Sequence, residues 1–256
     1  MSGIAFKTGG GEGPDLVLIH GFGSDRLSWI GNTPALMQVA RVHALDLPGH
    51  GDSLDVDCGD ASPAALAVQV SRVLAENSIA RAHLVGHSLG GGIAMLMAAK
   101  HPERVASLTL IAAAGLGTGI DHAFLTRFPG LSEIDETTGL LHRLVVRPQL
   151  INRLTVQRVI EQLARPGARD ALSRIAAGII ATEAQLSETA QQIALLDVPR
   201  LVVFGTEDRI NPPDLAAINR FGGTSLLIPS AGHLPHIEAA AQVNRAVATL
   251  LSGTAH

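Results

Sequence analysis

Short, strongly apolar runs recur along the chain and predict the strands of a buried sheet. They are rich in leucine and β-branched residues, and they cover residues 16–19, 42–45, 82–85, 107–111, 200–204 and 224–228. Apolar strands without polar alternation are typical of parallel sheets that are covered on both faces. Alanine-rich segments alternate with most of these runs. The order predicts an α/β fold with a mostly parallel central sheet and helices on both faces.

Two helices can be placed by their own local signals. Ser62 followed by Pro63 is an N-cap with proline at the first helical position, and it predicts a helix that runs to about Asn77. Near the C-terminus, apolar residues recur at helical spacing from Ile237 to Leu251. This second pattern predicts a terminal helix that packs against the sheet.

The pattern changes between residues 115 and 183. Strand-like runs disappear, and helical stretches are interrupted at FPG, VRPQ and ARPGA. A gap of this size between strands needs an explanation in a fold of alternating strands and helices. We interpret it as a helical cap inserted at 115–183 over a core formed by 1–114 and 184–256. The alternative is that these helices pack on the sheet like the others.

The composition narrows the class of partner. The chain has 256 residues, a formal charge of −4 and no basic run, so the sequence shows no positively charged patch of the kind that binds nucleic acid or a membrane surface. Its one cysteine, Cys58, excludes an internal disulfide and a cysteine-built metal site. No signal peptide or apolar run of membrane-spanning length is present. We therefore expect a cytoplasmic protein that acts on a small molecule.

One motif carries nucleophile chemistry. The segment GHSLGG, residues 86–91, matches G-x-S-x-G, in which a sharp turn between a strand and a helix presents a serine hydroxyl above the sheet. Glycines two residues before and after the serine avoid collisions with the neighbouring strand and helix. An apolar run precedes Ser88 and an alanine-rich segment follows it. The context favours a nucleophilic serine over an incidental one.

A serine hydroxyl needs a base, and the base needs an orienting acid. In folds built around this turn, the acid and then the histidine follow the serine along the chain. Asp208 comes just after a predicted strand, at the carboxyl edge of the sheet where open α/β folds build their sites. His233 follows the next strand. We predict a triad of Ser88, Asp208 and His233.

Each member has rivals nearby in the sequence. Glu207 adjoins the predicted acid, but only one of two neighbouring loop residues is expected to face the imidazole. His236 is a second histidine, as a base or as part of a metal site, although no third ligand accompanies it at suitable spacing. An acid on the preceding strand would also serve, but none occurs there until Asp121.

The tetrahedral intermediate needs two amide donors. A glycine-rich loop, HGFG, follows the first strong strand, and we predict that the backbone amides of Phe22 and Leu89 form the oxyanion hole. Phe22 is also a candidate wall of the acyl pocket. His20 is expected to anchor the loop, and so are three polar residues of the segment ALDLPGHGDS by local hydrogen bonds, namely Asp46, His50 and Asp52.

The sequence says less about the substrate. Phe124 and Phe128 of the expected cap are the candidate substrate-binding residues and favour a small to medium apolar acyl group. Several further residues have no assigned role: Trp29, His87 and Met95 line the site or pack, and Arg127, Arg143 and Arg147 bind a substrate carboxylate or face solvent. No metal or organic cofactor is implied. The oligomeric state stays open, with a homodimer as one alternative.

Six segments together resemble the α/β-hydrolase superfamily in type, order and spacing: HGFG, DLPGHGDS, GHSLGGG, HPERV, GTEDRINP and AGHLPHIE. Within it the chain is most similar to the catalytic domain of acetoin dehydrogenase complex acyltransferases, on HGFGSDRLSW, RVHALDLPGHGDS and RVASLTLIAAAGLGTGID. That family carries a lipoyl domain before the hydrolase-like domain. The segment before the first predicted core strand of this chain is too short for a lipoyl domain. We therefore expect either a separate carrier that delivers the acyl group or a free-standing hydrolase.

The leading hypothesis is a serine hydrolase that cleaves a small ester, thioester or related acyl substrate through an acyl-enzyme. One alternative is an acyltransferase that passes an acetyl group to a dihydrolipoyl or CoA thiol. Another is a carbon–carbon hydrolase of ring-fission diketones, and a third is a binding protein that keeps the fold without the chemistry. Superfamily members with an aspartate nucleophile are excluded because Ser88 occupies that position.

Overall fold

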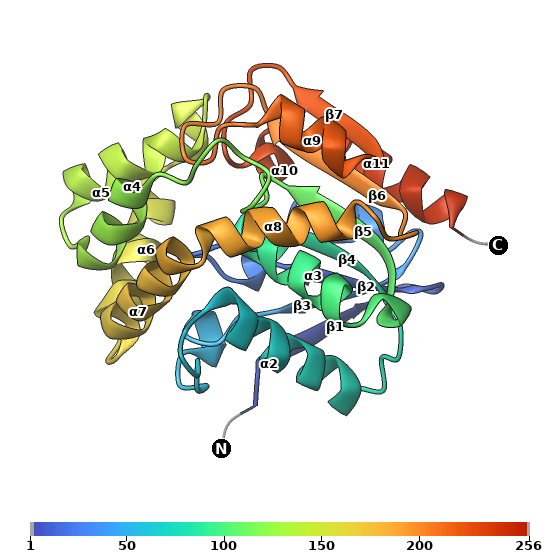
Figure 1. Ribbon diagram of the computed structural model, residues 1–256. Helices are drawn as coiled ribbons and strands as arrows, with labels where there is room; N and C mark the ends of the chain where they lie inside the picture. The colour runs from blue at the N-terminus through green and yellow to red at the C-terminus, as the bar shows by residue number, and fades with distance from the viewer. Residues whose placement is uncertain (1–2, 255–256) are drawn as a thin grey trace.

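A central sheet organises the computed structural model, which describes residues 3–254 (Figure 1). Its strands are β1 (Phe6–Gly10), β2 (Asp15–Ile19), β3 (Arg41–Leu45), β4 (Ala82–His87), β5 (Val105–Ile111), β6 (Arg200–Gly205) and β7 (Thr224–Ile228). They are ordered β1-β3-β2-β4-β5-β6-β7. Only the β1–β3 pair is antiparallel. The predicted α/β class with a mostly parallel sheet is confirmed.

The first strand was missed by the sequence pattern. β1 lies at the edge of the sheet and pairs only with β3, and its residues FKTGG are largely exposed. An exposed edge strand needs no continuous apolar run, so its pattern does not stand out from a polar terminus. The bounds of the other six strands agree with the predicted runs to within two residues.

Helices cover both faces of the sheet. One face packs against α2 (Pro63–Glu76), α3 (Leu89–Lys100), α8 (Glu183–Ile193) and α9 (Leu215–Phe221), and the other packs against α1 (Thr33–Leu36) and α11 (Ala240–Gly253). Alternate residues of the strands enter the two core layers, as the period of a strand requires. Leu16 and Leu18 lie with Trp29 and Val243, whereas Val17 and Ile19 face the α3 side.

Of the two helices predicted from local signals, one begins as expected and the other is divided in two. The side chain of Ser62 accepts a hydrogen bond from the amide of Ala65, so the cap of α2 forms as expected. The terminal helix is broken at Ala239, which separates α10 (Pro235–Glu238) from α11. The break accompanies tertiary contacts of Glu238, whose buried carboxylate accepts hydrogen bonds from the amides of Gly232 and Val146.

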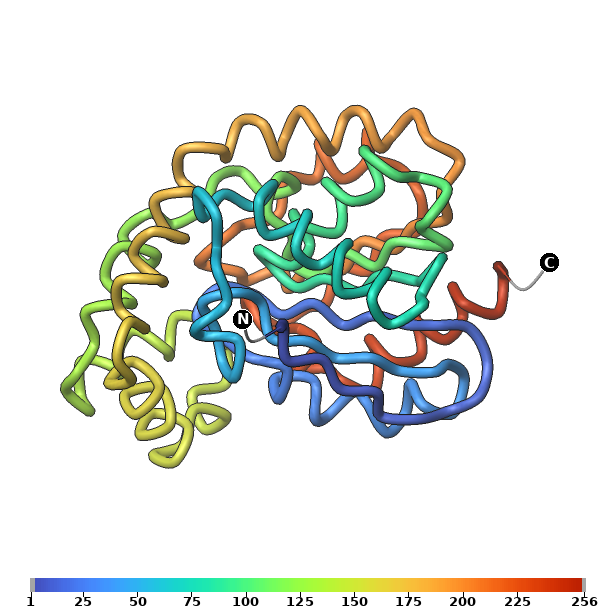
Figure 2. Tube along the Cα trace, turned by 90° about the horizontal axis from the view of Figure 1, so that it is seen from below, coloured from blue at the N-terminus to red at the C-terminus, as the bar shows by residue number. Residues whose placement is uncertain are grey.

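The part of the chain between β5 and β6 that precedes α8 forms a group of helices beyond one end of the strands (Figures 1 and 2). We call them the insertion helices: α4 (His122–Arg127), η4 (Phe128–Gly130), α5 (Ile134–Leu141), η5 (His142–Leu144), η6 (Pro148–Leu150), α6 (Arg153–Ala164) and α7 (Ala168–Ala181). The shorter helices of the core are η1 (Arg26–Trp29), η2 (Gly51–Ser53) and η3 (Pro102–Arg104). Among residues 3–254, none of the helices has the length and apolar character to cross a membrane.

Candidate active site

Ser88 occupies a sharp turn between β4 and α3. Its backbone has φ of 52° and ψ of −113°, a conformation that a residue with a side chain rarely adopts. The turn is held by hydrogen bonds from the Ser88 amide to the carbonyl of Ile111 and from the amides of Gly91 and Ala114 to the Ser88 carbonyl. Strain at a residue that the surroundings hold this firmly is typical of a functional site.

The two glycines of the motif permit a close approach of backbone to backbone. A Cβ on Gly86 would collide with the carbonyl of Gly90, and a Cβ on Gly90 would collide with the carbonyl of Ile19 in β2. Neither neighbour can yield, because both are main-chain atoms of the sheet and the helix. The structure therefore gives the physical reason for both glycines that the motif contains.

Replacing Gly90 by alanine is expected to lower the free energy of unfolding by about 3 kcal/mol, because overpacking against a fixed carbonyl forces the backbone to move. Urea denaturation measures it. Gly139→Ala is the matched control, since Gly139 also lies in a helix but has open space around its Cβ position. That variant is expected to be up to about 1 kcal/mol more stable. Equal effects of the two substitutions would contradict the argument.

His233 and Asp208 meet at the carboxyl edge of the sheet, in the loops that follow β7 and β6. The Nδ1 nitrogen of His233 donates a hydrogen bond of 2.8 Å to Oδ2 of Asp208. The other carboxylate oxygen accepts from the amides of Ile210 and Asn211 at 2.8 and 2.9 Å. Because the proton of the imidazole lies on Nδ1, its Nε2 nitrogen carries a free lone pair.

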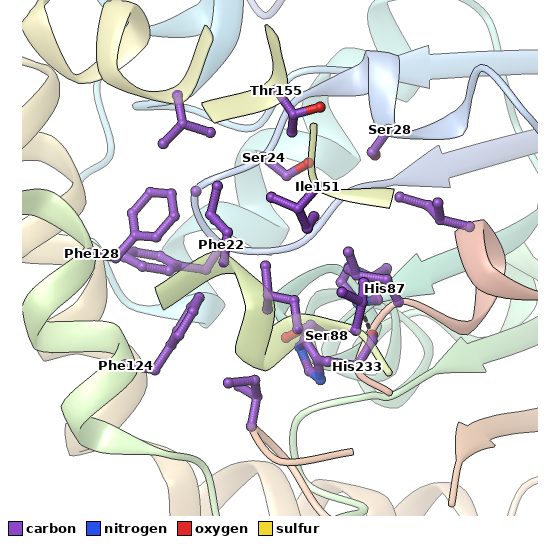
Figure 3. A pocket seen from close by; sticks show the side chains of 18 of the residues that line it. Phe22, Ser24, Ser28, His87, Ser88, Phe124, Phe128, Ile151, Thr155 and His233 are labelled. Carbon is purple, nitrogen blue, oxygen red and sulfur yellow. Dashed lines mark hydrogen bonds between the residues drawn. The ribbon is translucent and has the colours of Figure 1, made fainter. Parts of the chain in front are cut away.

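His233 is also held by its backbone, through a hydrogen bond with His87, the residue before Ser88. Nε2 of His87 donates to the carbonyl of His233 at 2.9 Å, and the amide of His233 donates to the carbonyl of Leu144. Ser88, His87 and His233 all line one pocket, and Figure 3 shows their side chains close together. Burial lowers the pKa of His87 well below its usual value, so this ring stays neutral.

The alternatives considered for the acid and the base, Glu207, Asp121 and His236, occupy other environments than Asp208 and His233. Glu207 is exposed, whereas its neighbour Asp208 is buried against His233. Asp121 caps α4 and pairs with Arg143 at 2.5 Å. His236 is fully buried between the rings of Trp29 and His87, and both of its nitrogens lack a partner among the described residues. No group of three metal-ligating side chains occurs within residues 3–254.

The loop after β2 is anchored by histidines. Nδ1 of His20 donates to the carbonyl of Gly21, and its Nε2 accepts from the amide of Leu47. Nε2 of His50 accepts from the amide of Gly23. These bonds match the structural role expected for both rings, and Asp46 adds to it by accepting from the Arg26 and Asp52 amides.

The two amides predicted for the oxyanion hole are available. Phe22 lies in the turn of this loop, and Leu89 is the first residue of α3, where an amide has no partner within the helix. Neither amide donates in the backbone hydrogen bonds that connect the described loops and helix ends.

The pocket above Ser88 is largely apolar and has a volume of about 430 Å³. Three aromatic rings form one wall, with ring centroids 5.6 Å apart for Phe22 and Phe128 and 5.8 Å apart for Phe124 and Phe128 (Figure 3). The structure thus brings both insertion phenylalanines to the predicted site. Of the residues left open in the sequence, His87 lines the pocket, whereas Trp29 and Met95 are buried in the core.

The arginine that lines the pocket is not one singled out from the sequence. Arg127, Arg143 and Arg147 pair with Glu136, Asp121 and Glu238 and are not among the lining residues. Arg158 of α6 lines it instead, together with Gln162 and Asp25. No local signal marked Arg158, because its partner lies 133 positions away in the chain.

Buried neutral histidines are expected to make the protein sensitive to acid. Burial lowers the pKa of His20 to about 4 and that of His50 and His236 to about 3. In the unfolded chain these rings protonate near pH 6.5, so the unfolded state binds more protons and the free energy of unfolding falls as the pH drops. Each ring is expected to cost about 2 kcal/mol between pH 8 and pH 5.

Urea denaturation at both pH values measures this loss. The variant His236→Phe removes one of the three rings while keeping an aromatic side chain between Trp29 and His87. Its loss between pH 8 and pH 5 is expected to be smaller than that of the wild type by about 2 kcal/mol. An unchanged pH dependence in this variant would show that His236 does not titrate as its burial implies.

Comparison with known proteins adds independent information. A family model described as alpha/beta hydrolase fold matches residues 14–240. The acetyltransferase component of the acetoin cleaving system of Pseudomonas putida is 37% identical over 96% of this chain, which spans 65% of that protein. The pimeloyl-[acyl-carrier protein] methyl ester esterase of Aeromonas hydrophila is 32% identical, over 89% of this chain and 91% of the relative.

Solved structures agree on the fold. A meta-cleavage product hydrolase from Pseudomonas fluorescens IP01 superposes with a TM-score of 0.86 over 98% of this chain and 94% of that chain, at 24% identity. A membrane phospholipase A superposes with a TM-score of 0.80 at 28% identity, over 98% of this chain and 83% of that chain.

Proposed function

Because the chain belongs to the alpha/beta hydrolase fold family and is therefore an enzyme, we propose that it is a serine hydrolase that cleaves a small ester, thioester or related acyl substrate. The family membership confirms the resemblance inferred from the sequence. The relatives named as an acetyltransferase component and as an esterase favour an enzyme over a binding protein without chemistry. The catalytic roles, the acyl-enzyme and the substrate class below are our proposal.

Catalysis begins at Ser88. Nε2 of His233 takes the hydroxyl proton while Oγ attacks the acyl carbonyl, and Asp208 holds the imidazole in the tautomer that leaves Nε2 free. The amides of Phe22 and Leu89 stabilise the oxyanion. The protonated imidazole then gives its proton to the leaving alcohol or thiol, and an acyl-enzyme forms. Water, deprotonated by His233, releases the acid and restores Ser88.

One observation carries the proposal: the Nδ1–Oδ2 bond of 2.8 Å joins His233 to Asp208 in the pocket that also contains Ser88. The buried Asp208 carboxylate accepts hydrogen bonds from two backbone amides and from the imidazole of His233, and these bonds fix its orientation toward the ring. The aromatic wall formed with Phe124 and Phe128 supports an apolar acyl group. We propose on the same ground that the insertion helices are a cap over the site.

Labelling with a fluorophosphonate probe tests the nucleophile. We expect one covalent adduct per chain, located at Ser88 by mass spectrometry of the digested protein. A panel of p-nitrophenyl esters, thioesters and ring-fission diketones, compared by kcat/KM, then ranks the substrates. Absence of an adduct together with activity on none of the esters or thioesters would overturn the proposal.

A second candidate is acyl transfer to a thiol, which uses the same residues with a different acceptor. It is favoured by the relative from Pseudomonas putida, whose name describes a dihydrolipoyllysine-residue acetyltransferase component. Incubation with acetyl-CoA and dihydrolipoamide distinguishes the two. Formation of S-acetyldihydrolipoamide faster than free acetate would favour transfer, whereas acetate without the thioester product would favour hydrolysis.

A further inference from the structure

The loop that carries the Phe22 amide is in contact with the insertion helices at two places. We call residues 20–25 the oxyanion loop. At Gly23, a Cβ would collide with the ring of Phe128, and that ring also packs on Phe22. At Asp25, the carboxylate binds two side chains of α6. The insertion helices therefore hold this loop from one side, in addition to the hydrogen bonds of His20 and His50 that anchor it to the core.

The Asp25 carboxylate makes the hydrogen bonds that join the oxyanion loop to α6. Its Oδ2 oxygen accepts hydrogen bonds of 2.6 Å from both Arg158 and Gln162, and its Oδ1 oxygen accepts one of 2.8 Å from the amide of Leu27. Burial by itself would raise the pKa of Asp25, but the bonds from Gln162 and Leu27 and the charge of Arg158 outweigh it and lower the pKa. The group is thus held as a carboxylate.

Stability alone does not account for this arrangement. The Arg158 side chain is 46% exposed, and ion pairs with a partner this exposed contribute little to folding. The bonds do fix geometry, because one oxygen of a nearly buried carboxylate joins two residues, one turn apart on α6, to a loop 133 positions earlier in the chain. All three side chains line the pocket that Ser88 and His233 also line, so the link belongs to the wall of the proposed site.

We propose that Asp25 is a positioning residue, which by binding Arg158 and Gln162 of α6 holds the oxyanion loop so that the Phe22 amide is aimed at the developing oxyanion. The insertion helices then complete the oxyanion hole as well as covering the site. This inference rests on the proposed serine-hydrolase function. It assigns Asp25 no contact with the substrate carbonyl and no proton transfer.

The variant Asp25→Asn tests the link. Oδ1 is needed as the acceptor for the Leu27 amide, so the new amide group faces Arg158 and Gln162, and these groups cannot donate to it. Arg158→Met removes the Arg158 half of this link from the other side while keeping an apolar stem, and it leaves the Gln162 bond in place. Glu136→Gln is the control, because it breaks an exposed pair with Arg127 within the insertion helices, away from the pocket.

The readout is the ratio of inhibition constants for a methyl ketone and the matching trifluoromethyl ketone. The trifluoromethyl ketone adds the serine hydroxyl and forms an oxyanion, whereas the methyl ketone does so poorly. Loss of one oxyanion donor typically lowers kcat by about 100- to 1000-fold, so a displaced donor is expected to lower the ratio by about 10- to 100-fold. In Asp25→Asn we expect kcat to fall by the same factor, with KM within about threefold.

Three outcomes separate the possibilities. A wild-type protein with no preference for the trifluoromethyl ketone would refute the proposed function itself. A preserved ratio in Asp25→Asn, with both ketones weakened equally or not at all, would overturn the positioning role alone. If Asp25→Asn fails to fold, Arg158→Met and Gln162→Leu carry the test. A double-mutant cycle of Asp25→Asn with Arg158→Met is expected to be strongly non-additive, because both remove one interaction.

Discussion

Replacing Ser88 by alanine is expected to lower the turnover of a p-nitrophenyl ester by on the order of a million-fold. The reason is that the acyl-enzyme cannot form without the hydroxyl, whereas the other groups of the site stay in place. The strained backbone at this position accepts alanine as well as serine, so the fold is expected to be retained.

The measurement is burst and steady-state release of p-nitrophenolate. Ser173→Ala is the control, since Ser173 is an exposed serine of α7 whose hydroxyl bonds only to the carbonyl of Arg169 among the described groups. That variant is expected to keep wild-type kcat and its fluorophosphonate adduct. If Ser88→Ala keeps activity near the wild-type level, Ser88 is not the nucleophile.

Replacing Asp208 by asparagine is expected to lower kcat by about ten-thousand-fold while the protein stays folded. The amides of Ile210 and Asn211 both need an oxygen acceptor, so they fix the carbonyl of the new side chain toward themselves. Its NH₂ group then faces His233 and donates to Nδ1. The imidazole proton is forced to Nε2, where it blocks acceptance of the Ser88 proton.

Glu207→Gln provides the matched comparison, because it makes the same chemical change at the exposed neighbour. We expect its kcat to remain within about twofold of the wild type, and thermal unfolding of both variants to report whether the loop stays folded. A small loss of kcat in Asp208→Asn with a large one in Glu207→Gln would reverse the assignment of the acid. Similar small losses in both would remove the acid from the mechanism.

Much of the site was predictable because its signals are local. The turn around Ser88 needs glycines at fixed offsets, and the structure shows the collisions that these glycines avoid. Asp208 and His233 each follow an apolar strand, and the carboxyl ends of parallel strands meet at one edge of the sheet. Residues far apart in the chain could therefore be assigned to one place without coordinates.

Other features could not be predicted because their causes are distant or weakly patterned. The edge strand β1 has no continuous apolar run, and the helix break at Ala239 accompanies bonds of Glu238 to the loops at 146 and 232. The pocket-lining Arg158 was missed because its partner, Asp25, lies 133 positions away in the chain. A charged side chain on an amphipathic helix looks the same in a sequence whether it faces solvent or a pocket.

The sequence by itself determined the six apolar strands, the turn at Ser88 and the placement of Asp208 and His233 at one edge of the sheet, since apolar periodicity and turn chemistry act between near neighbours. Only the tertiary structure decided which face of α6 meets the oxyanion loop and that Asp25 binds Arg158. Such contacts depend on how separately formed elements pack, and packing is a property of the whole chain rather than of any segment.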